Sequence, residues 1–465
     1  SWFFMVYVIA QSIQFSDSMQ YALGGFQQFN KETIVKLVRD VVIQSITQVG
    51  FILLGRYFGA LNPEIGELVG SVIGFIVGSY VDNLLAFVLG AYFFKQTIKP
   101  FGFKFKHVFF FNFDKEQVKE ILTFGLKVLP SRLGLHTTDF LITVMITMWL
   151  YNYSTLAGLY SIAFAVTKLL EVAFSIGAPV AEAYNNGKRH LTKYLCEEQL
   201  RWWSFISIGI LTVPILFFVP SVLVKVGGDY GGAAFMIYFL FIGQLLNFPS
   251  DFPGLIARNA DMPGISTGLE IIKQVITAIS FLIALAPWGI ASWLGREYVI
   301  IFWLIAITPG VVVKFILGWI VVNKKIVKVK FPLFQMIVST LLALIPLILI
   351  TLTMDFILNI LFEVSVVMFY LVAGLMLIGY FFIFPALITF PLIGFFGGFD
   401  KRNLEHFHNA VKISGPSHFL VNIMYKTSLW GHNHSPLKDK FAIPHEKADE
   451  EAIELTKIRN EFIKA

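Results

Sequence analysis

Charged residues are scarce in this sequence. Asp, Glu, Lys and Arg together make up 14% of its 465 residues, whereas soluble domains carry about 25%. The mean hydropathy is correspondingly high, at +0.72. The apolar residues come in runs of roughly 20 or more, the length needed to cross a hydrocarbon core about 30 Å thick. This composition is typical of a protein that resides in a lipid bilayer.

Cysteine is nearly absent as well, since Cys196 is the only one. This excludes an internal disulfide and a zinc site made of cysteines alone. The sequence has no P-loop, nucleophile elbow or kinase-like motif, and its glycine clusters lack the strand-to-helix context of phosphate-binding loops. We therefore predict no enzyme, catalytic residue, cofactor, bound metal or nucleic-acid partner. The pair His432 and His434 suggests a metal only weakly, and we expect it in a solvated loop.

The apolar runs favour helices, because an open sheet cannot cross a bilayer and β-barrel strands show short alternating segments instead. We predict an all-α integral membrane protein, a helical bundle with about eleven transmembrane helices. Gly70, Gly74 and Gly78 in the third span have the spacing that lets a neighbouring helix approach closely. The expected spans are 1–27, 33–58, 67–94, 121–150, 156–184, 200–226, 233–257, 264–286, 298–322, 331–354 and 364–390.

Basic residues gather in the loops on one side of these spans. By the positive-inside rule that side is cytoplasmic, and the polar tail from about Gly397 lies on it. The cations of that side are Lys31, Lys95 to Lys106, Lys188 to Lys193, Arg258 and Lys324 to Lys330, while the other side has Arg56, Lys225 and Arg296. The sequon at Asn152 falls on the outer side, where it is either a glycosylation site or a plain polar turn.

Charges inside the apolar runs are the candidate functional residues, because a charge at membrane depth must face a cavity or a partner. Lys168, Arg132 and Lys273 each lie about 14–18 Å from the end of their helix. Lys and Arg suit phosphate by charge and by donor count. We predict these three as substrate-binding residues. Lys127 and Lys314 lie nearer a helix end, and we expect them to reach the interface.

The acidic residues in the same runs have two interpretations. Lys168 with Glu171, and Glu270 with Lys273, are spaced i, i+3, so each pair shares a helix face and either neutralises itself or contacts a headgroup. Alternatively the carboxylates couple transport to H+ or Na+, since buried carboxylates titrate upward in apolar surroundings. Asp251 lies between Pro249 and Pro253, which indicate either a cavity-lining hinge or a packed kink. The charge-partner or coupling candidates are Asp139, Glu171, Glu270, Asp82 and Asp251, with Glu182 a further one.

A resemblance rests on the order of motifs in the middle of the chain. These are Leu129-Pro130-Ser131, Asp139, Leu159-Tyr160-Ser161-Ile162-Ala163, Pro179, Glu182 and Gly187-Lys188. This order resembles the first two helices of the second lobe in polysaccharide and lipid-linked oligosaccharide flippases of the multidrug/oligosaccharidyl-lipid/polysaccharide exporter superfamily. The resemblance covers about residues 1 to 395 and rests on pattern and spacing.

The resemblance implies a two-lobe bundle with fourteen helices in the intact protein, of which the first three are absent from this sequence. Its parts are then the end of the N-terminal lobe (1–96), a cytoplasmic amphipathic inter-lobe linker (97–118), the C-terminal lobe (119–326), two additional helices (327–397) and a cytoplasmic tail (398–465). It implies a monomeric transporter in the cytoplasmic membrane that moves a lipid-linked glycan by alternating access, in contact with membrane lipids. A cation-coupled multidrug exporter is the alternative, and a membrane glycosyltransferase or polymerase is a weaker one.

Overall fold

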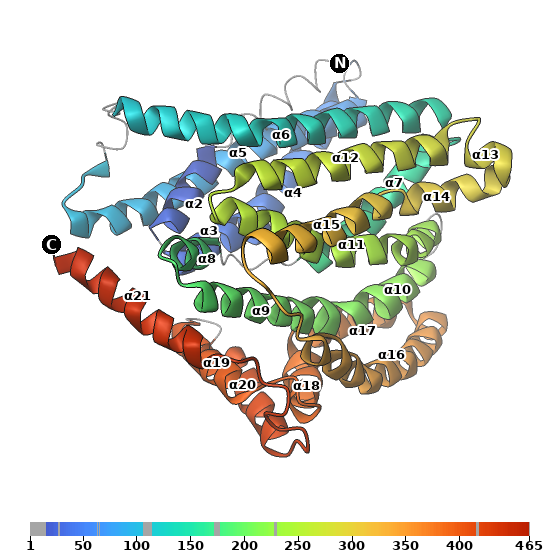
Figure 1. The fold of residues 1–465 in the computed structure, drawn as a ribbon. Helices are drawn as coiled ribbons and strands as arrows, with labels where there is room; N and C mark the ends of the chain where they lie inside the picture. The colour runs from blue at the N-terminus through green and yellow to red at the C-terminus, as the bar shows by residue number, and fades with distance from the viewer. Residues whose placement is uncertain are drawn as a thin grey trace. The chain divides into compact units, whose positions relative to one another are not determined.

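The fold is seen in a computed structural model (Figure 1). It describes residues 15–26, 28–62, 64, 66–105, 114–171, 177–226, 230–414 and 418–464. Within these ranges every regular element is a helix and no strand occurs, which confirms the all-α prediction. The chain divides into two compact units, Ser1–Lys119 and Glu120–Ala465. The boundary falls just after the predicted linker 97–118, of which residues 106–113 lie outside the described ranges.

Seven helical segments among the described residues are long and apolar enough to cross a membrane. They match the third predicted span and the last six, and they establish a multi-pass membrane protein. The segments are Val69–Phe101, Arg189–Lys225, Gly231–Asn259, Pro263–Trp293, Val299–Lys325, Phe334–Val364 and Val366–Ile383.

The four other predicted spans are not confirmed. Most of the first, residues 1–14, lies outside the described ranges. The second contains a π-helical stretch, Val38–Ile43, and only Gly50–Leu61 of it forms an apolar helix, which is shorter than a span. Residues 121–150 fall in the helix Lys115–Trp149, which is not among the helices apolar enough to span, and residues 156–184 begin in the helix Tyr153–Lys168. The latter helix ends at Lys168 after 16 residues.

Unit 1 contains α2 (Phe15–Gly25), α3 (Phe29–Leu37), α4 (Gln44–Leu61) and α5 (Gly66–Ile98), followed by a 3-10 turn at Lys99–Phe101. Glycines allow the backbones of α4 and α5 to contact each other directly. A Cβ built on Gly70 falls 2.2 Å from the carbonyl oxygen of Gly55, and one on Gly74 falls 2.0 Å from that of Phe51. No other residue fits there, which confirms the close approach predicted from Gly70 and Gly74 and supplies its partner, α4.

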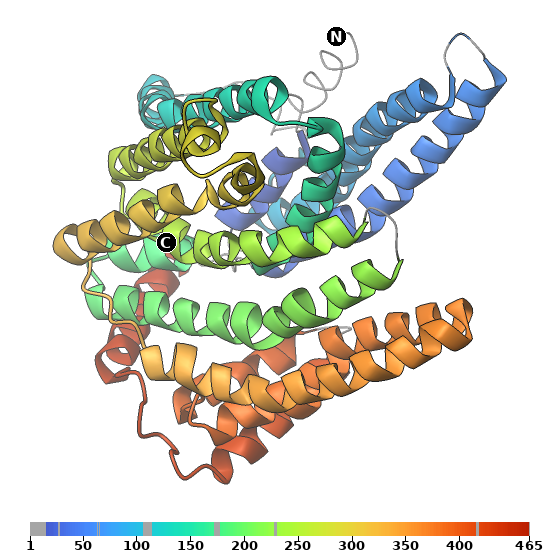
Figure 2. The same cartoon turned by 90° about the vertical axis from the view of Figure 1, so that its right-hand side faces the viewer.

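Unit 2 begins in the long helix α6, and Figure 2 shows α16 and α17 running alongside the connected helices α9 and α10. Its helices are α6 (Lys115–Trp149), α7 (Tyr153–Lys168), α8 (Gly177–Asn185), α9 (Arg189–Ile206), α10 (Val219–Val226), α11 (Tyr230–Asn259), α12 (Pro263–Leu285), α13 (Ile290–Trp293), α14 (Val299–Ile305), α15 (Thr308–Lys325), α16 (Ser339–Val364), α17 (Val366–Ile378), α18 (Phe390–Phe395), α19 (Lys401–Ile413), α20 (His418–Asn433) and α21 (Glu446–Lys464). Short 3-10 turns lie at Leu169–Glu171 and Arg296–Tyr298. π-Helical turns lie at Ser207–Leu211, Pro214–Phe218, Phe334–Val338, Gly379–Ile383 and Pro385–Thr389.

Helix α11 is the central helix of unit 2. It packs against α7, α8, α10, α12, α14 and α15. Its first half contributes Ile237 to a cluster with Phe281 and Trp303. Its second half contributes Phe252 to another cluster, which contains Trp203 and Trp319. Packing of this kind, together with polar contacts, is what holds helices together in lipid. The polar residues in the second half of α11 therefore lie among several neighbouring helices.

The tail from about Gly397 is folded onto the bundle. Phe399 and Phe407 pack with Phe205 of α9 in an apolar cluster. His432, predicted to lie in a solvated loop, is 3% exposed, and its Nδ1 lies 3.1 Å from the carbonyl oxygen of Phe399. The tail helices are amphipathic, and their apolar faces are buried against α9 and α18.

Candidate functional site

Two prolines shape α11 around Asp251. Proline has no backbone N–H, so Pro253 cannot donate the helical hydrogen bond to the carbonyl of Pro249, four residues earlier. That carbonyl instead accepts a hydrogen bond of 3.0 Å from Nε1 of Trp319 on α15. The break between Pro249 and Pro253 is therefore satisfied from a neighbouring helix. It fixes the turn of α11 that carries Asp251.

Helix α15 approaches α11 and α12 unusually closely at this level. A Cβ built on Gly310 falls 2.2 Å from Oγ1 of Thr277 and 2.7 Å from the carbonyl oxygen of Lys273, both on α12. On the other side, Ser250 of α11 donates a hydrogen bond of 3.0 Å to the carbonyl of Val311. These contacts let polar side chains from α11, α12 and α15 meet.

Lys314 of α15 lies at the centre of this meeting point. Its Nζ donates a hydrogen bond of 2.6 Å to Oδ1 of Asp251 and also donates to Glu270. The residue is 4% exposed. The prediction that Lys314 reaches the membrane interface is therefore wrong. The carboxylates of Asp251 and Glu270, on neighbouring helices, neutralise the ammonium group of Lys314, so the lysine side chain does not need to extend to water.

Lys273 of α12 makes looser contacts. Its Nζ lies 3.2 Å from Oδ1 of Asn247 and 3.6 Å from Oδ1 of Asp251. Glu270, three residues before Lys273, accepts instead from Lys314 and from Nε2 of Gln274, the latter at 2.8 Å. The i, i+3 neighbours Glu270 and Lys273 therefore find their ion-pair partners on other helices.

Exposure divides the cluster into a buried layer and an open one. The side chains of Lys314 and Lys273 are 5% and 11% exposed, whereas that of Asp251 is 51% exposed. Asp251 is thus the accessible face of the cluster, shared by both ammonium groups behind it.

Asp139 of α6 adds a third carboxylate to the surroundings of Lys273. It interacts electrostatically with Lys273 and with its own neighbour His136. A hydrogen bond of 2.7 Å from Oγ1 of Thr267 to the carbonyl of Lys127 ties α12 to α6. Counting Asp139, the cluster has one carboxylate more than it has ammonium groups. The predicted residues Lys273, Asp251, Glu270 and Asp139 thus belong to one charged region.

The other predicted site residues lie elsewhere. Lys168 is exposed at the end of α7, with its Nζ 5.7 Å from the ring centroid of Phe164. Arg132 is exposed on α6, and no contact joins either cation to Lys273 among the described side chains. The side chain of Glu171 lies outside the described ones. Asp82 is buried in α5 of unit 1.

A second charged centre, around Arg201, was not anticipated. Arg201 of α9 is completely buried and donates to Glu198, to Asp400 of the tail and, at 3.1 Å, to Gln335. Asn403 also donates to Glu198, at 2.5 Å. The signal available in the sequence was the i, i+3 pair Glu198 and Arg201 at the start of a long apolar run. This centre joins the tail to the bundle.

Two further features bear on predicted sites. A cleft of about 1120 Å³ lies between the α6–α7 turn and the α12–α14 connection, and Asn152, Trp149 and Arg296 are among its lining residues. Asn152, the residue of the sequon, is exposed and has a φ of 52°.

Among the residues that the structure describes, no group of three or more His, Cys, Asp or Glu side chains is arranged to hold a metal ion.

No family model, curated protein or solved structure matches this chain.

Proposed function

We propose that this membrane protein is a flippase that moves a polyprenyl-phosphate- or pyrophosphate-linked oligosaccharide across the cytoplasmic membrane by alternating access. The observation that carries the proposal is the pair of buried lysines, Lys273 and Lys314, behind the exposed carboxylate of Asp251. Charges within membrane helices generally mark a transport path. A phosphate group is an anion that two adjacent ammonium groups can bind strongly.

The two lysines have different roles in this proposal. Lys314 is held by Asp251 and Glu270, so it stays charged and fixed when no substrate is present. Lys273 donates to the neutral amide of Asn247 and lies farther from Asp251, so it is the ammonium more easily recruited. A substrate phosphate takes the place of the Asp251 carboxylate beside Lys273, and Asp251 turns to the open side.

The prolines of α11 suit this exchange. Because Pro253 lacks a backbone N–H, the turn that carries Asp251 is held by the hydrogen bond from Trp319 and not by one within α11, so release of that single contact lets the turn change its direction. The lipid tail stays in the bilayer and the basic loops face the cytoplasm. We propose a monomer without enzymatic activity, with H+ or Na+ as the coupling ion.

One observation favours the alternative, a cation-coupled multidrug exporter. Asp139, Asp251 and Glu270 outnumber Lys273 and Lys314, so the region can take up a coupling proton. In that case Asp139 is the group to test, because its carboxylate interacts with Lys273 without the short hydrogen bonds that hold Glu270.

The test is a reconstituted-vesicle assay with a fluorescent glycan on a polyprenyl pyrophosphate, in which a membrane-impermeant reagent reports the side of the glycan. We expect movement by the wild-type protein and a rate about tenfold lower for Lys273→Gln, which loses a charged donor. Lys324→Gln, at the exposed end of α15, is the matched control and keeps the wild-type rate. Absence of movement with every polyprenyl-linked glycan tried contradicts the flippase proposal. Drug efflux that depends on Asp139 establishes the alternative.

A further inference from the structure

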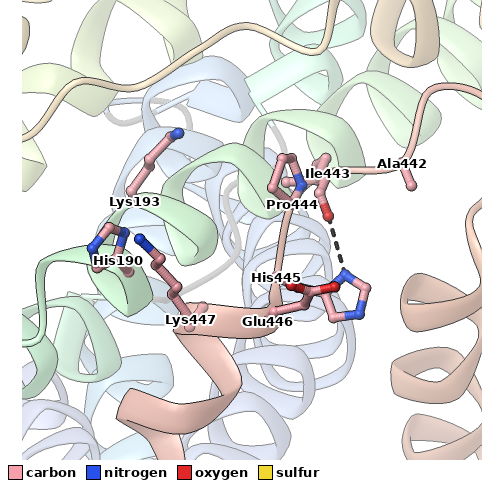
Figure 3. A pocket seen from close by; sticks show the side chains of 9 residues that line it. His190, Lys193, Ala442, Ile443, Pro444, His445, Glu446 and Lys447 are labelled. Atoms are coloured by element: carbon pink, nitrogen blue, oxygen red, sulfur yellow. Dashed lines mark hydrogen bonds between the residues drawn. The ribbon is translucent and has the colours of Figure 1, made fainter.

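A pocket of about 430 Å³ lies where the tail helix α21 meets the first turn of α9 (Figure 3). We propose that it binds a phosphate-bearing anion, either a soluble phosphate compound or the headgroup of an anionic lipid. The side chains that matter are His190 and Lys193 of α9, and His445, Glu446 and Lys447 at the start of α21. The proposal does not depend on the transport activity proposed above.

The charge of the pocket lining is predominantly basic. Two lysines and two histidines face a single carboxylate, that of Glu446. Figure 3 shows Lys193, His190 and Lys447 at one side of the pocket, with the Glu446 carboxylate and the His445 ring at the other. Nδ1 of His445 lies 3.2 Å from the carbonyl oxygen of Ile443, which fixes this ring against the backbone. Lys193, His190 and Lys447 therefore form the anion-attracting side.

The acidic residues beside the pocket already have partners. Glu451 accepts a hydrogen bond of 2.7 Å from the backbone N–H of Leu191, and Glu454 accepts one from Lys188. These two contacts dock α21 onto the start of α9. Among the described residues Lys193 forms one ion pair, with Glu197 at 3.8 Å.

His190 and Lys447 have no ion-pair or hydrogen-bond partner among the described residues. Their donors are therefore directed at solvent in the pocket, where a ligand can use them. An ammonium group binds phosphate as a point charge with three donors, and the volume is within the range of about 300–1,000 Å³ of small-molecule sites. A ligand held by Lys193 and Lys447 bridges α9 and α21, so its binding also holds the tail helix in place.

In one arm the full chain in detergent is titrated with inorganic pyrophosphate by calorimetry. In the other arm the chain is placed in nanodiscs of phosphatidylcholine with or without phosphatidic acid, and the protection of its tail from proteolysis is measured. We expect Lys193→Gln and Lys447→Gln each to weaken binding about tenfold, because each removes one charge-assisted hydrogen bond. Glu446→Gln removes the one repulsive carboxylate and is expected to strengthen binding. Lys457→Gln, an exposed lysine farther along α21, is the matched control and leaves binding unchanged.

The two arms separate the two sources of phosphate. Pyrophosphate binding that the lysine variants weaken supports a soluble ligand. Tail protection from proteolysis that appears only with phosphatidic acid, and is lost in the lysine variants, supports a lipid headgroup. No binding of either compound, or binding that Lys193→Gln and Lys447→Gln leave unchanged, overturns the proposal. The opposite directions expected for Glu446→Gln and the lysine variants separate site effects from general unfolding.

Discussion

The indole Nε1 of Trp319 donates its hydrogen bond to the carbonyl of Pro249, at 3.0 Å, in place of the backbone N–H that Pro253 lacks. A helix with a proline normally kinks or leaves a carbonyl exposed. Here a side chain from α15 satisfies the carbonyl of α11, and the broken turn becomes a fixed part of the charge cluster.

Replacing Trp319 with Phe removes this donor but keeps a ring against Phe331, whose centroid lies 4.7 Å from that of Trp319. The buried carbonyl of Pro249 then has no partner, and we expect a loss of about 1–3 kcal/mol in unfolding free energy. The midpoint of thermal unfolding in detergent measures it. Trp288→Phe, whose side chain is exposed, is the control, and equal midpoints for the two variants contradict the role given to the indole N–H.

Lys314→Gln leaves Asp251 and Glu270 without their shared cation. Breaking a buried ion pair by removing one partner typically costs about 3–5 kcal/mol, and we expect that loss in the unfolding free energy. Asp251 keeps Lys273 at 3.6 Å, so adding Glu270→Gln removes the carboxylate that is left without a cation and recovers part of the loss. Lys324→Gln on the same helix is exposed and is expected to stay within about 0.5 kcal/mol of wild type. Equal destabilisation by the Lys314 and Lys324 substitutions argues against a structural ion cluster.

Gly310→Ala places a methyl group against Thr277 and the carbonyl oxygen of Lys273. The two helices must separate, so we expect a loss of about 1–3 kcal/mol in stability. Gly268→Ala in α12 is the matched control, because a Cβ there meets nothing within 4 Å and alanine favours the helix by about 1 kcal/mol. Unfolding midpoints of the two variants should shift in opposite directions, and a shift in the same direction contradicts the close packing of α15 on α12.

The attachment of the tail should weaken in acid. Burial by itself raises the pKa of Asp400, but the Arg201 guanidinium and the backbone N–H groups of Asn403 and Ile443 outweigh it and hold the pKa below its usual range. The stabilisation is therefore fully present above the unfolded pKa of about 3.9 and is lost as the pH falls through the lower folded value. Hydrogen exchange of the α19 and α20 amides measures the opening of the tail at each pH.

Asp400→Asn should open the tail at neutral pH, since Arg201 keeps only Glu198 as an anionic partner. It should also remove most of the acid dependence of tail opening. Asp261→Asn, in an exposed turn with a φ of 58°, is the control and is expected to behave as wild type. A tail whose exchange is the same in Asp400→Asn and wild type contradicts this account of the attachment.

Much of the charge cluster could be predicted from the sequence, because Lys273, Glu270 and Asp251 interrupt apolar runs. What could not be predicted is which charge faces which. The i, i+3 rule places Glu270 and Lys273 on one face of α12, but the position of α15 decides that Glu270 reaches Lys314. Distance along the helix suggested an interfacial Lys314, whereas its burial is set by the neighbouring helices α11 and α12.

The tail could not be predicted from composition for a similar reason. Residues after Gly397 are polar on average, but Phe399 packs against Phe205 and Phe407 packs against Phe399. Asp400 caps the start of α19 through a 2.8 Å hydrogen bond from the N–H of Asn403, and a cap residue is normally taken as an exposed one. Its pairing with Arg201 is visible only when α9 and α19 are brought together.

The position of Arg201 sets an order of events during synthesis. Its two carboxylate partners are Glu198, three residues earlier on the same helix, and Asp400, which follows 199 residues later. Translation proceeds at about 5–20 residues per second, so Arg201 waits on the order of ten seconds or more for Asp400. During that interval Glu198 alone accompanies the guanidinium as α9 enters the bilayer. The final closure of unit 2 is therefore a late event, made only after Asp400 has left the ribosome.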